Sequence, residues 1–338
     1  MRIILIGFGI VGEAFAKIIT DKSKELRKIF GFKPSIVSVV DISGAVVDPN
    51  GLNVEELQTS KIKCGSISLH SCFKPKLNSV EILENVDADV VVEVTPTNVV
   101  DGQPGLSHIM TALKKKRHVI TTNKGPLAIA LPALMELASY NRVQIRFSGT
   151  VGGGTPILDF GKKCLIGDRI ISLRGILNGT TNYILTRMDE AEISMETALE
   201  EAKSKGYAEA NPSYDLDGID SACKLVIMAN WLMNKCVTLK NVDVSGIKGV
   251  TIEKVKEAKN NGFAIKLLAS ISNEKLAVKT QLVPQHHPLC VGGTLNAVTF
   301  EAEYAGELTI VGKGAGGIET AGAILRDLIE IRREITAL

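Results

Sequence analysis

The chain has 338 residues, of which 45% are hydrophobic, which is enough for two well-buried domains. Lysine and arginine number 39 against 37 acids, so no basic excess is available to neutralise a nucleic acid or an anionic membrane surface. The six cysteines lie far apart, without zinc-site spacing, and no signal peptide or membrane-length apolar run is evident. We therefore expect a soluble, cytoplasmic protein that partners neither nucleic acid nor membrane.

Short apolar runs and helical patterns alternate through the first part of the chain. We expect strands at 2–6, 36–40, 88–94 and 118–122, with helices at 12–20 and 106–115 between them. This alternation is typical of a parallel sheet with right-handed crossovers. Ligands bind such sheets beyond the carboxyl ends of the strands, where this sequence places polar residues. The pattern predicts a Rossmann-type α/β domain.

A glycine fingerprint directly follows the first strand. Gly7, Gly9 and Gly12 match G-x-G-x-x-G, with Ile10 and Val11 opening a helix, and Asp41 closes the second strand. These glycines permit a tight turn, approach of a pyrophosphate and close helix packing, and an acid placed like Asp41 accepts hydrogen bonds from ribose hydroxyls. We therefore predict a dinucleotide site, although the glycines alone also suit an ordinary turn.

The choice between NAD and NADP rests on the residues around Asp41. A carboxylate there would repel a ribose 2′-phosphate, and the next residue, Ile42, offers no guanidinium to bind one. Lys61 and Lys63 still leave NADP open. We expect NAD, or use of both cofactors, ahead of strict NADP.

The organisation of the chain changes at the glycine-rich stretch 148–156. Beyond it, strands are expected at 169–176, 277–282 and 297–303, and helices at 195–204 and 218–233, which is typical of an α+β domain with a partly antiparallel sheet. We predict a dinucleotide-binding domain at 1–148, a substrate and dimerisation domain at 149–311, and a segment at 312–338 that packs back on the first domain.

Two lysines are candidates for the chemistry. Lys124 follows the strand ending at 122 in a segment that Gly125-Pro126 is expected to end, where an ammonium can stabilise negative charge on a reduced carbonyl oxygen. Asp220 and Lys224 lie four residues apart on a helix face that becomes apolar further along, which indicates partial burial. The alternatives are a solvated loop lysine and an ordinary surface ion pair.

Several further segments complete a family resemblance over essentially the whole chain. With the fingerprint and the segment 121–124, the sequence resembles homoserine dehydrogenase, an NAD(P)-dependent oxidoreductase that interconverts L-homoserine and L-aspartate 4-semialdehyde. The order and spacing of these motifs make the set specific. The other matching segments are 151–156, 175–183, 206–209, 215–224 and 312–320.

The resemblance implies a role for each matched residue. Lys224 would donate the proton during reduction and accept it during oxidation, Asp220 would orient Lys224, and Lys124 would flank the same carbonyl. The substrate would be held by Glu209 and Asp215 within a pocket that Thr180 and Tyr207 complete. Contacts on the nicotinamide side would come from Thr95 and Gly314. The family also suggests a homodimer formed through the sheet of the second domain.

Two departures from the family pattern concern a cation and regulation. The family often holds a monovalent cation such as sodium through backbone carbonyls, here those of Val151 and Gly153, and a preceding acid. This chain has Ser148 at the acid's place. We therefore expect a weak structural cation or none. The sequence matches no aspartokinase or regulatory domain, so we do not expect threonine feedback.

Two competing functions remain open at this point. Aspartate-semialdehyde dehydrogenase would need a nucleophilic cysteine, for which Cys164 is the nearest approach, and insensitivity to iodoacetamide would exclude it. A non-catalytic nucleotide sensor would keep the fingerprint without turnover. Tight NAD(H) binding without turnover of any semialdehyde would support the sensor.

Overall fold

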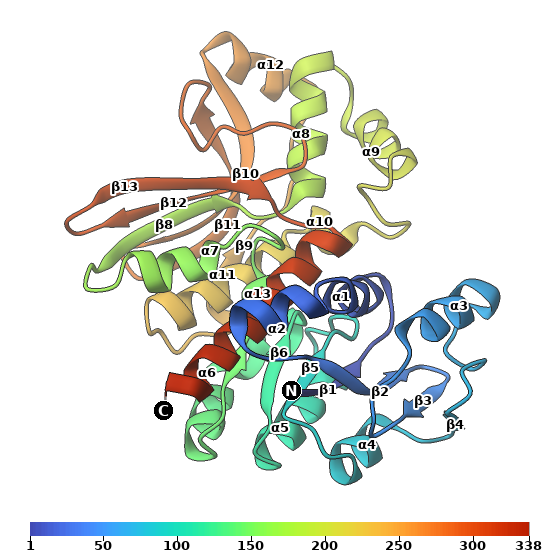
Figure 1. The fold of residues 1–338 in the computed structure, drawn as a ribbon. Helices are drawn as coiled ribbons and strands as arrows, with labels where there is room; N and C mark the ends of the chain where they lie inside the picture. Colours follow the sequence, from blue (N-terminus) through green and yellow to red (C-terminus); the bar gives the residue numbers. More distant parts are fainter. Residues whose placement is uncertain (338) are drawn as a thin grey trace. The chain divides into compact units, whose positions relative to one another are not determined.

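A computed structural model of the chain describes residues 1–337, which divide into two compact units (Figure 1). The first unit comprises Met1–Thr150 together with the residues from Gly316 onward, and the second is Val151–Ala315. The chain therefore returns to its first unit a few residues after the predicted position at 312. Strand β13 (Gly306–Lys313) keeps residue 312 in the second unit because it pairs along its length with β12 (Leu295–Ala302).

The first unit contains a seven-stranded sheet in the order β4-β3-β2-β1-β5-β6-β7. Five of its strands are parallel: β1 (Arg2–Ile6), β2 (Ser35–Asp41), β5 (Val90–Glu93), β6 (His118–Thr121) and β7 (Ile145–Arg146). Their near-continuous β-branched sequences suit strands that are buried on both faces. The edge strands β3 (Gly44–Val47) and β4 (Phe73–Pro75) are antiparallel, which the sequence reading did not anticipate.

The long helix α6 (Lys124–Tyr140) is the main difference from the expected helices of the first unit. Gly125-Pro126 was expected to end the segment after β6, but it lies in the first turn of α6. Proline is tolerated there because the first amides of a helix have no carbonyl partner within it. The other helices of this part are α1 (Ile10–Asp21), α2 (Ser23–Phe30), α3 (Val54–Cys64), α4 (Ser79–Asn85) and α5 (Gly105–Lys114).

The last helix, α13 (Gly317–Ala337), completes the core of the first unit. It packs against α1, and four of its apolar residues are buried in the same cluster as the strands β1 and β5. The expectation that the end of the chain packs on the first domain is consistent with this arrangement. Within residues 1–337, no helix combines the length and apolarity required to span a membrane.

The second unit is built on a six-stranded, mostly antiparallel sheet in the order β13-β12-β8-β10-β11-β9. Only β9 (Val242–Val244) and β11 (Lys275–Pro284) pair in parallel; β8 (Ile170–Ile176) and β10 (Phe263–Ser272) complete the sheet. The predicted combination of a Rossmann-type domain with an α+β domain is confirmed. The helices of this unit are α7 (Ile157–Asp159), α8 (Gly179–Ala191), α9 (Met195–Ser204), α10 (Ser213–Leu216), α11 (Ile219–Leu232) and α12 (Ile252–Asn260), with short turns η2 (Phe160–Cys164) and η3 (Leu239–Asn241).

Candidate active site

The three fingerprint glycines meet three different steric demands. Gly7 has a φ of +103°, and a Cβ there would lie 2.8 Å from the carbonyl oxygen of Val94. A Cβ on Gly12 would lie 2.2 Å from the carbonyl oxygen of Gly7, so helix and turn are in direct contact. Around Gly9, by contrast, no atom of the described residues lies within 4 Å of the added Cβ. Open space is therefore present where a pyrophosphate needs to approach the backbone.

The start of α1 offers the amides that a dinucleotide requires. Gly9 is the N-cap of α1 and provides no side-chain cap, and Ile10 is 80% exposed while Val11 is half-buried. The first-turn amides of a helix carry partial positive charge and bind phosphate oxygens. The residues present thus fit the dinucleotide cofactor predicted from the sequence.

Asp41 is held in a fixed orientation at the end of β2. Its Oδ1 accepts hydrogen bonds from the amide of Ser43 at 2.7 Å and the hydroxyl of Ser43 at 2.5 Å, and its Oδ2 accepts one from the amide of Ile67 at 3.2 Å. Three donors leave lone pairs on both oxygens. The carboxylate can therefore still accept hydrogen bonds from ribose hydroxyls, and Ile42 beside it is fully exposed.

Lys124 begins α6 at the same edge of the sheet. The side chain of Asn123 caps this helix by accepting a hydrogen bond from the amide of Gly125 at 3.1 Å. The amide group of Asn123 also donates to the hydroxyl of Thr95 at 3.2 Å, which joins two of the predicted segments. Lys124 is half-buried. The cap thus fixes the point at which the Lys124 side chain leaves the backbone.

In the second unit, Lys224 and Asp220 form a buried ion pair on α11. The Lys224 Nζ lies 2.7 Å from the Asp220 Oδ2, and the two residues are 7% and 6% exposed. The ammonium also donates to the carbonyl oxygen of Leu177 at 2.6 Å. A surface ion pair, the alternative considered from the sequence, does not describe this arrangement, because both groups are withdrawn from solvent.

Asn178 links this pair to a second carboxylate. Its amide nitrogen lies 2.7 Å from the Asp215 Oδ1 and 3.0 Å from the Asp220 Oδ2, while its Oδ1 caps α8 by accepting from the amide of Thr181. Burial, followed by the charge of Asp220, raises the pKa of Asp215, against a smaller opposing effect of hydrogen bonds from Asn178 and Thr180. Lys224 is therefore near two carboxyl groups, the buried Asp220 and the half-buried Asp215.

Thr180 and Tyr207 also come together, but Glu209 does not join them. The Thr180 hydroxyl donates to the carbonyl oxygen of Tyr207 at 2.6 Å, and the Tyr207 ring packs edge-on against Tyr183 with centroids 5.0 Å apart. Tyr207 is 46% exposed. Glu209, two residues further along the chain, is exposed, and no hydrogen bond joins it to Thr180 or Tyr207 within residues 1–337.

Gly314 packs against a buried residue that the sequence reading missed. A Cβ on Gly314 would lie 2.0 Å from the side-chain nitrogen of Asn296, and this nitrogen donates to the carbonyl oxygen of Leu177 at 3.1 Å. Leu177 thus accepts from both Asn296 and Lys224. No sequence pattern signals Asn296, because it lies on β12, more than 70 residues beyond Lys224.

Ser148 is hydrogen-bonded to the last helix. Its amide and hydroxyl donate to the two carboxylate oxygens of Asp327 on α13, at 2.9 and 2.6 Å. Val151 is fully buried, and Gly153 has a φ of +53° within a turn closed by the amide of Thr155. Residues 1–337 contain no cluster of three His, Cys, Asp or Glu side chains able to hold a metal. The segment therefore does not supply the acid that the family's cation site uses.

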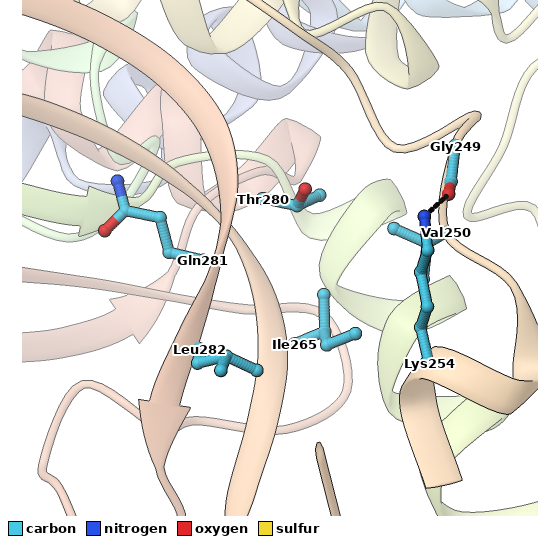
Figure 2. Close-up of a pocket in the computed structure, with 7 residues that line it drawn as sticks. All are labelled: Gly249, Val250, Lys254, Ile265, Thr280, Gln281 and Leu282. Atoms are coloured by element: carbon cyan, nitrogen blue, oxygen red, sulfur yellow. Dashed lines mark hydrogen bonds between the residues drawn. The ribbon is translucent and has the colours of Figure 1, made fainter. Parts of the chain in front are cut away.

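A surface pocket of the second unit lies apart from these residues in the chain (Figure 2). Its one titratable lining group, Lys254, donates its ammonium to the carbonyl oxygen of Gly249 at 3.0 Å. Lys254 is therefore already engaged by the backbone, and the pocket offers no other ionisable side chain to a ligand. The remaining lining residues are Val250, Ile265, Thr280, Gln281 and Leu282.

Comparison with known proteins identifies the family. Residues 7–148 match the family model "Homoserine dehydrogenase, NAD binding domain", and residues 156–329 match "Homoserine dehydrogenase". A homoserine dehydrogenase from Methanocaldococcus jannaschii is 46% identical over 332 residues, covering 98% of each chain. The chain belongs to the homoserine dehydrogenase family. The predicted enzyme class, an NAD(P)-dependent oxidoreductase, is thereby confirmed.

Two further relatives carry different nicotinamide cofactors in their names. An NAD(+)-dependent homoserine dehydrogenase from Pseudomonas canavaninivorans is 35% identical, covering 99% of this chain and 97% of its own. The solved structure of a hyperthermophilic archaeal homoserine dehydrogenase in complex with NADPH is 30% identical, with a TM-score of 0.87 and 98% coverage of both chains. Membership of the homoserine dehydrogenase family thus settles the reaction class and leaves the cofactor choice to the residues of the site.

Proposed function

We propose that this chain catalyses reversible hydride transfer between L-homoserine and L-aspartate 4-semialdehyde, a step of threonine and methionine biosynthesis, with Lys224 as the group that exchanges the proton. The supporting observation is the buried pair of Lys224 and Asp220, with Asp215 joined to it through Asn178. A buried ammonium flanked by carboxylates is an uncommon and costly arrangement that proton transfer would explain. When bound, the nicotinamide ring accepts or releases the hydride.

The proton would move on and off the Nζ of Lys224. During reduction of the aldehyde, Lys224 gives a proton to the carbonyl oxygen as negative charge develops there; during oxidation it takes the proton from the alcohol. Asp220 and the carbonyl of Leu177 orient the ammonium by accepting two of its hydrogen bonds. The third hydrogen of the ammonium remains for the substrate. Lys124, in the first unit, would stabilise the same oxygen.

Asp215 and Glu209 would recognise the amino-acid end of the substrate. Asp215 is half-buried and held by Asn178, so it offers a fixed acceptor for the substrate ammonium. Thr180 and Tyr207 would close the pocket around it. Glu209 is exposed and would contact the substrate from the segment that carries Tyr207.

We propose NAD as the preferred cofactor, with NADP as a weaker substitute. The fixed carboxylate of Asp41 suits the two ribose hydroxyls and repels a 2′-phosphate. Thr95 and Gly314 would contact the nicotinamide side. Lys61 and Lys63 on α3 supply the positive charge that would let NADP bind at all.

The test follows absorbance at 340 nm while the purified protein oxidises L-homoserine with NAD or NADP at alkaline pH. We expect cofactor reduction that depends on L-homoserine and is faster at subsaturating NAD than at equal NADP. Iodoacetamide should leave the rate unchanged, which separates this reaction from one that uses a cysteine thioester. Absence of reduction by folded protein would reject the proposal.

We propose that catalysis proceeds without a bound sodium ion. Ser148 uses both of its donors on Asp327, so this turn is anchored by a side chain of the protein itself. Any ion at Val151 and Gly153 would have neutral carbonyls alone, which bind sodium weakly. Replacement of sodium chloride with choline chloride should therefore leave the turnover rate within about twofold.

We propose a cytoplasmic homodimer joined through the sheet of the second unit. Exposed apolar side chains on that sheet, among them Ile171 and Leu282, support the assembly. The six cysteines form no disulfide within residues 1–337, which suits a reducing compartment. Sedimentation equilibrium should return twice the chain mass, and a monomer mass at micromolar concentration would contradict the dimer.

A further inference from the structure

A fully buried glutamate ends β5, the strand beside β1 in the dinucleotide-binding unit. Glu93 is the last residue of β5 and is 0% exposed. Its Oε1 accepts hydrogen bonds from the amide of Thr95 at 3.2 Å and from the Thr95 hydroxyl, and its Oε2 accepts one from the Thr121 hydroxyl at 3.0 Å. These groups all donate to it. This arrangement suits the ionised carboxylate, which only accepts.

Hydrogen bonds connect Glu93 both to Thr95, which follows β5, and to the segment 121–124, which follows β6. The Thr121 hydroxyl that donates to Glu93 accepts from the amide of Asn123 at 3.0 Å, and Asn123 caps the helix that Lys124 begins. His108 on α5 also lies nearby, with its Nδ1 3.6 Å from the Glu93 Oε1. One carboxylate therefore sets the conformation of the loops that follow β5 and β6.

The strand order would place this charge on the nicotinamide side of a bound cofactor. If the pyrophosphate binds at the turn after β1, Asp41 after β2 would hold the adenosine ribose on one side of β1. The nicotinamide half would then lie on the other side of β1, where β5 is its neighbour. Thr95, which Glu93 holds, lies at that end. Oxidised nicotinamide carries a positive charge, whereas the reduced ring is neutral.

We propose that Glu93 is a positioning residue whose buried charge makes the site bind oxidised cofactor more tightly relative to reduced cofactor. It accepts hydrogen bonds from Thr95 and Thr121, which in turn accept from Asn123, and its charge would act on the bound ring through space. The inference rests on the proposed binding of the cofactor along Gly7–Gly12. A unit charge at the distance of one intervening side chain should change the ratio of the two dissociation constants by roughly three- to tenfold.

The test compares Glu93→Gln with the unchanged chain by binding alone. Titration of NADH fluorescence gives its Kd, and displacement of NADH by NAD gives the second Kd, both in the same buffer. We expect Glu93→Gln to weaken NAD binding roughly three- to tenfold more than NADH binding. Equal changes in both constants, or none, would overturn the inference.

A matched variant separates charge from geometry. Thr121→Val removes one hydrogen bond to Glu93 and keeps the carboxylate, so it should change both constants by a similar factor and leave their ratio within about twofold. A shift of the ratio as large as that of Glu93→Gln would show that loop geometry is responsible and would overturn the inference. If the unchanged chain bound neither form, the proposed function would fail as well.

Discussion

Lys224 is the residue on which the proposed chemistry depends most directly. Its removal leaves Asp220 buried without its cation, so loss of stability can accompany loss of turnover. Arginine at this position keeps the positive charge but does not release a proton at any pH at which the protein is folded. The two substitutions therefore separate the chemical role of Lys224 from its structural role.

Lys224→Ala and Lys224→Arg should both lower kcat by about 10²- to 10⁴-fold, because the proton donor is lost in each. The Kd of NADH, measured by fluorescence, should stay within about twofold, since Lys224 lies outside the dinucleotide-binding unit. Lys203→Ala, which breaks an exposed ion pair on α9, serves as the control with unchanged kcat. Near-normal turnover of Lys224→Arg would show that the proton goes elsewhere.

The ionisation of Asp215 should make the free energy of unfolding depend on pH. Burial, and then the charge of Asp220, raise its pKa above the unfolded value. The stability that this group contributes is therefore complete below the unfolded pKa and is lost as the pH rises through the folded pKa. Asp215→Asn should raise the thermal midpoint relative to the unchanged chain at pH 8, and by less at pH 4, while raising KM for homoserine. Equal differences at both pH values would contradict this assignment.

Contacts between residues close in the sequence could be predicted, whereas contacts between residues far apart in the sequence could not. The spacing of Asp220 and Lys224 on one helix revealed their pairing, because four residues make one turn. Nothing in the sequence connects Lys224 with Asn296 or Ser148 with Asp327, since these contacts depend on how distant segments pack. Glu93 left one signal: a charged residue that ends an otherwise apolar strand at the ligand edge.

At the scale of elements, the turn between β1 and α1 contains two glycines with opposite surroundings. A side chain on Gly9 would enter open space, whereas a side chain on Gly12 would collide with the backbone of Gly7. Gly9→Val should fold normally and weaken NADH binding by about ten- to a hundredfold, because its side chain occupies the space that the pyrophosphate needs. Gly12→Ala should instead destabilise the fold by about 3 kcal/mol or more, since its Cβ meets backbone. Thermal unfolding and fluorescence titration of both variants check the contrast. Loss of stability in Gly9→Val would refute it.

Helices and strands could be predicted where their apolar residues recur at one regular spacing. Strands β1, β2, β5 and β6 and helices α1 and α5, together with α9 to the residue, follow from apolar periodicity, whereas α2, α3, α4 and β7 were not predicted. Helix α6 was missed because Gly125-Pro126 resembles a stop signal, although its meaning depends on whether a helix is ending or beginning there. Strand β4 has only three residues, too few for a periodic pattern to emerge.

For the whole molecule, the first unit depends on residues from both ends of the chain. Ala321, Ile324, Leu328 and Ile331 are fully buried in its core, and each large apolar side chain contributes about 1.5–3 kcal/mol. Their sum is comparable with the stability of a typical domain. A fragment of residues 1–150 should therefore show no cooperative thermal transition.

The matched control restores the missing helix to the same fragment. Residues 1–150 joined to 316–338 by a glycine and serine linker of about 15 residues should unfold cooperatively and bind NADH. Calorimetry of the two fragments provides the comparison. Cooperative unfolding of residues 1–150 alone would show that α13 is dispensable.

This dependence also imposes an order on events during biosynthesis. The 1–150 segment leaves the ribosome first, but α13 follows only after the whole second unit has been made. At about 5–20 residues per second, the nascent dinucleotide-binding unit waits on the order of ten seconds or more with part of its apolar core uncovered. The second unit, which is continuous in sequence, can finish folding meanwhile. A newly made chain would therefore bind chaperones through its N-terminal half and acquire cofactor affinity last.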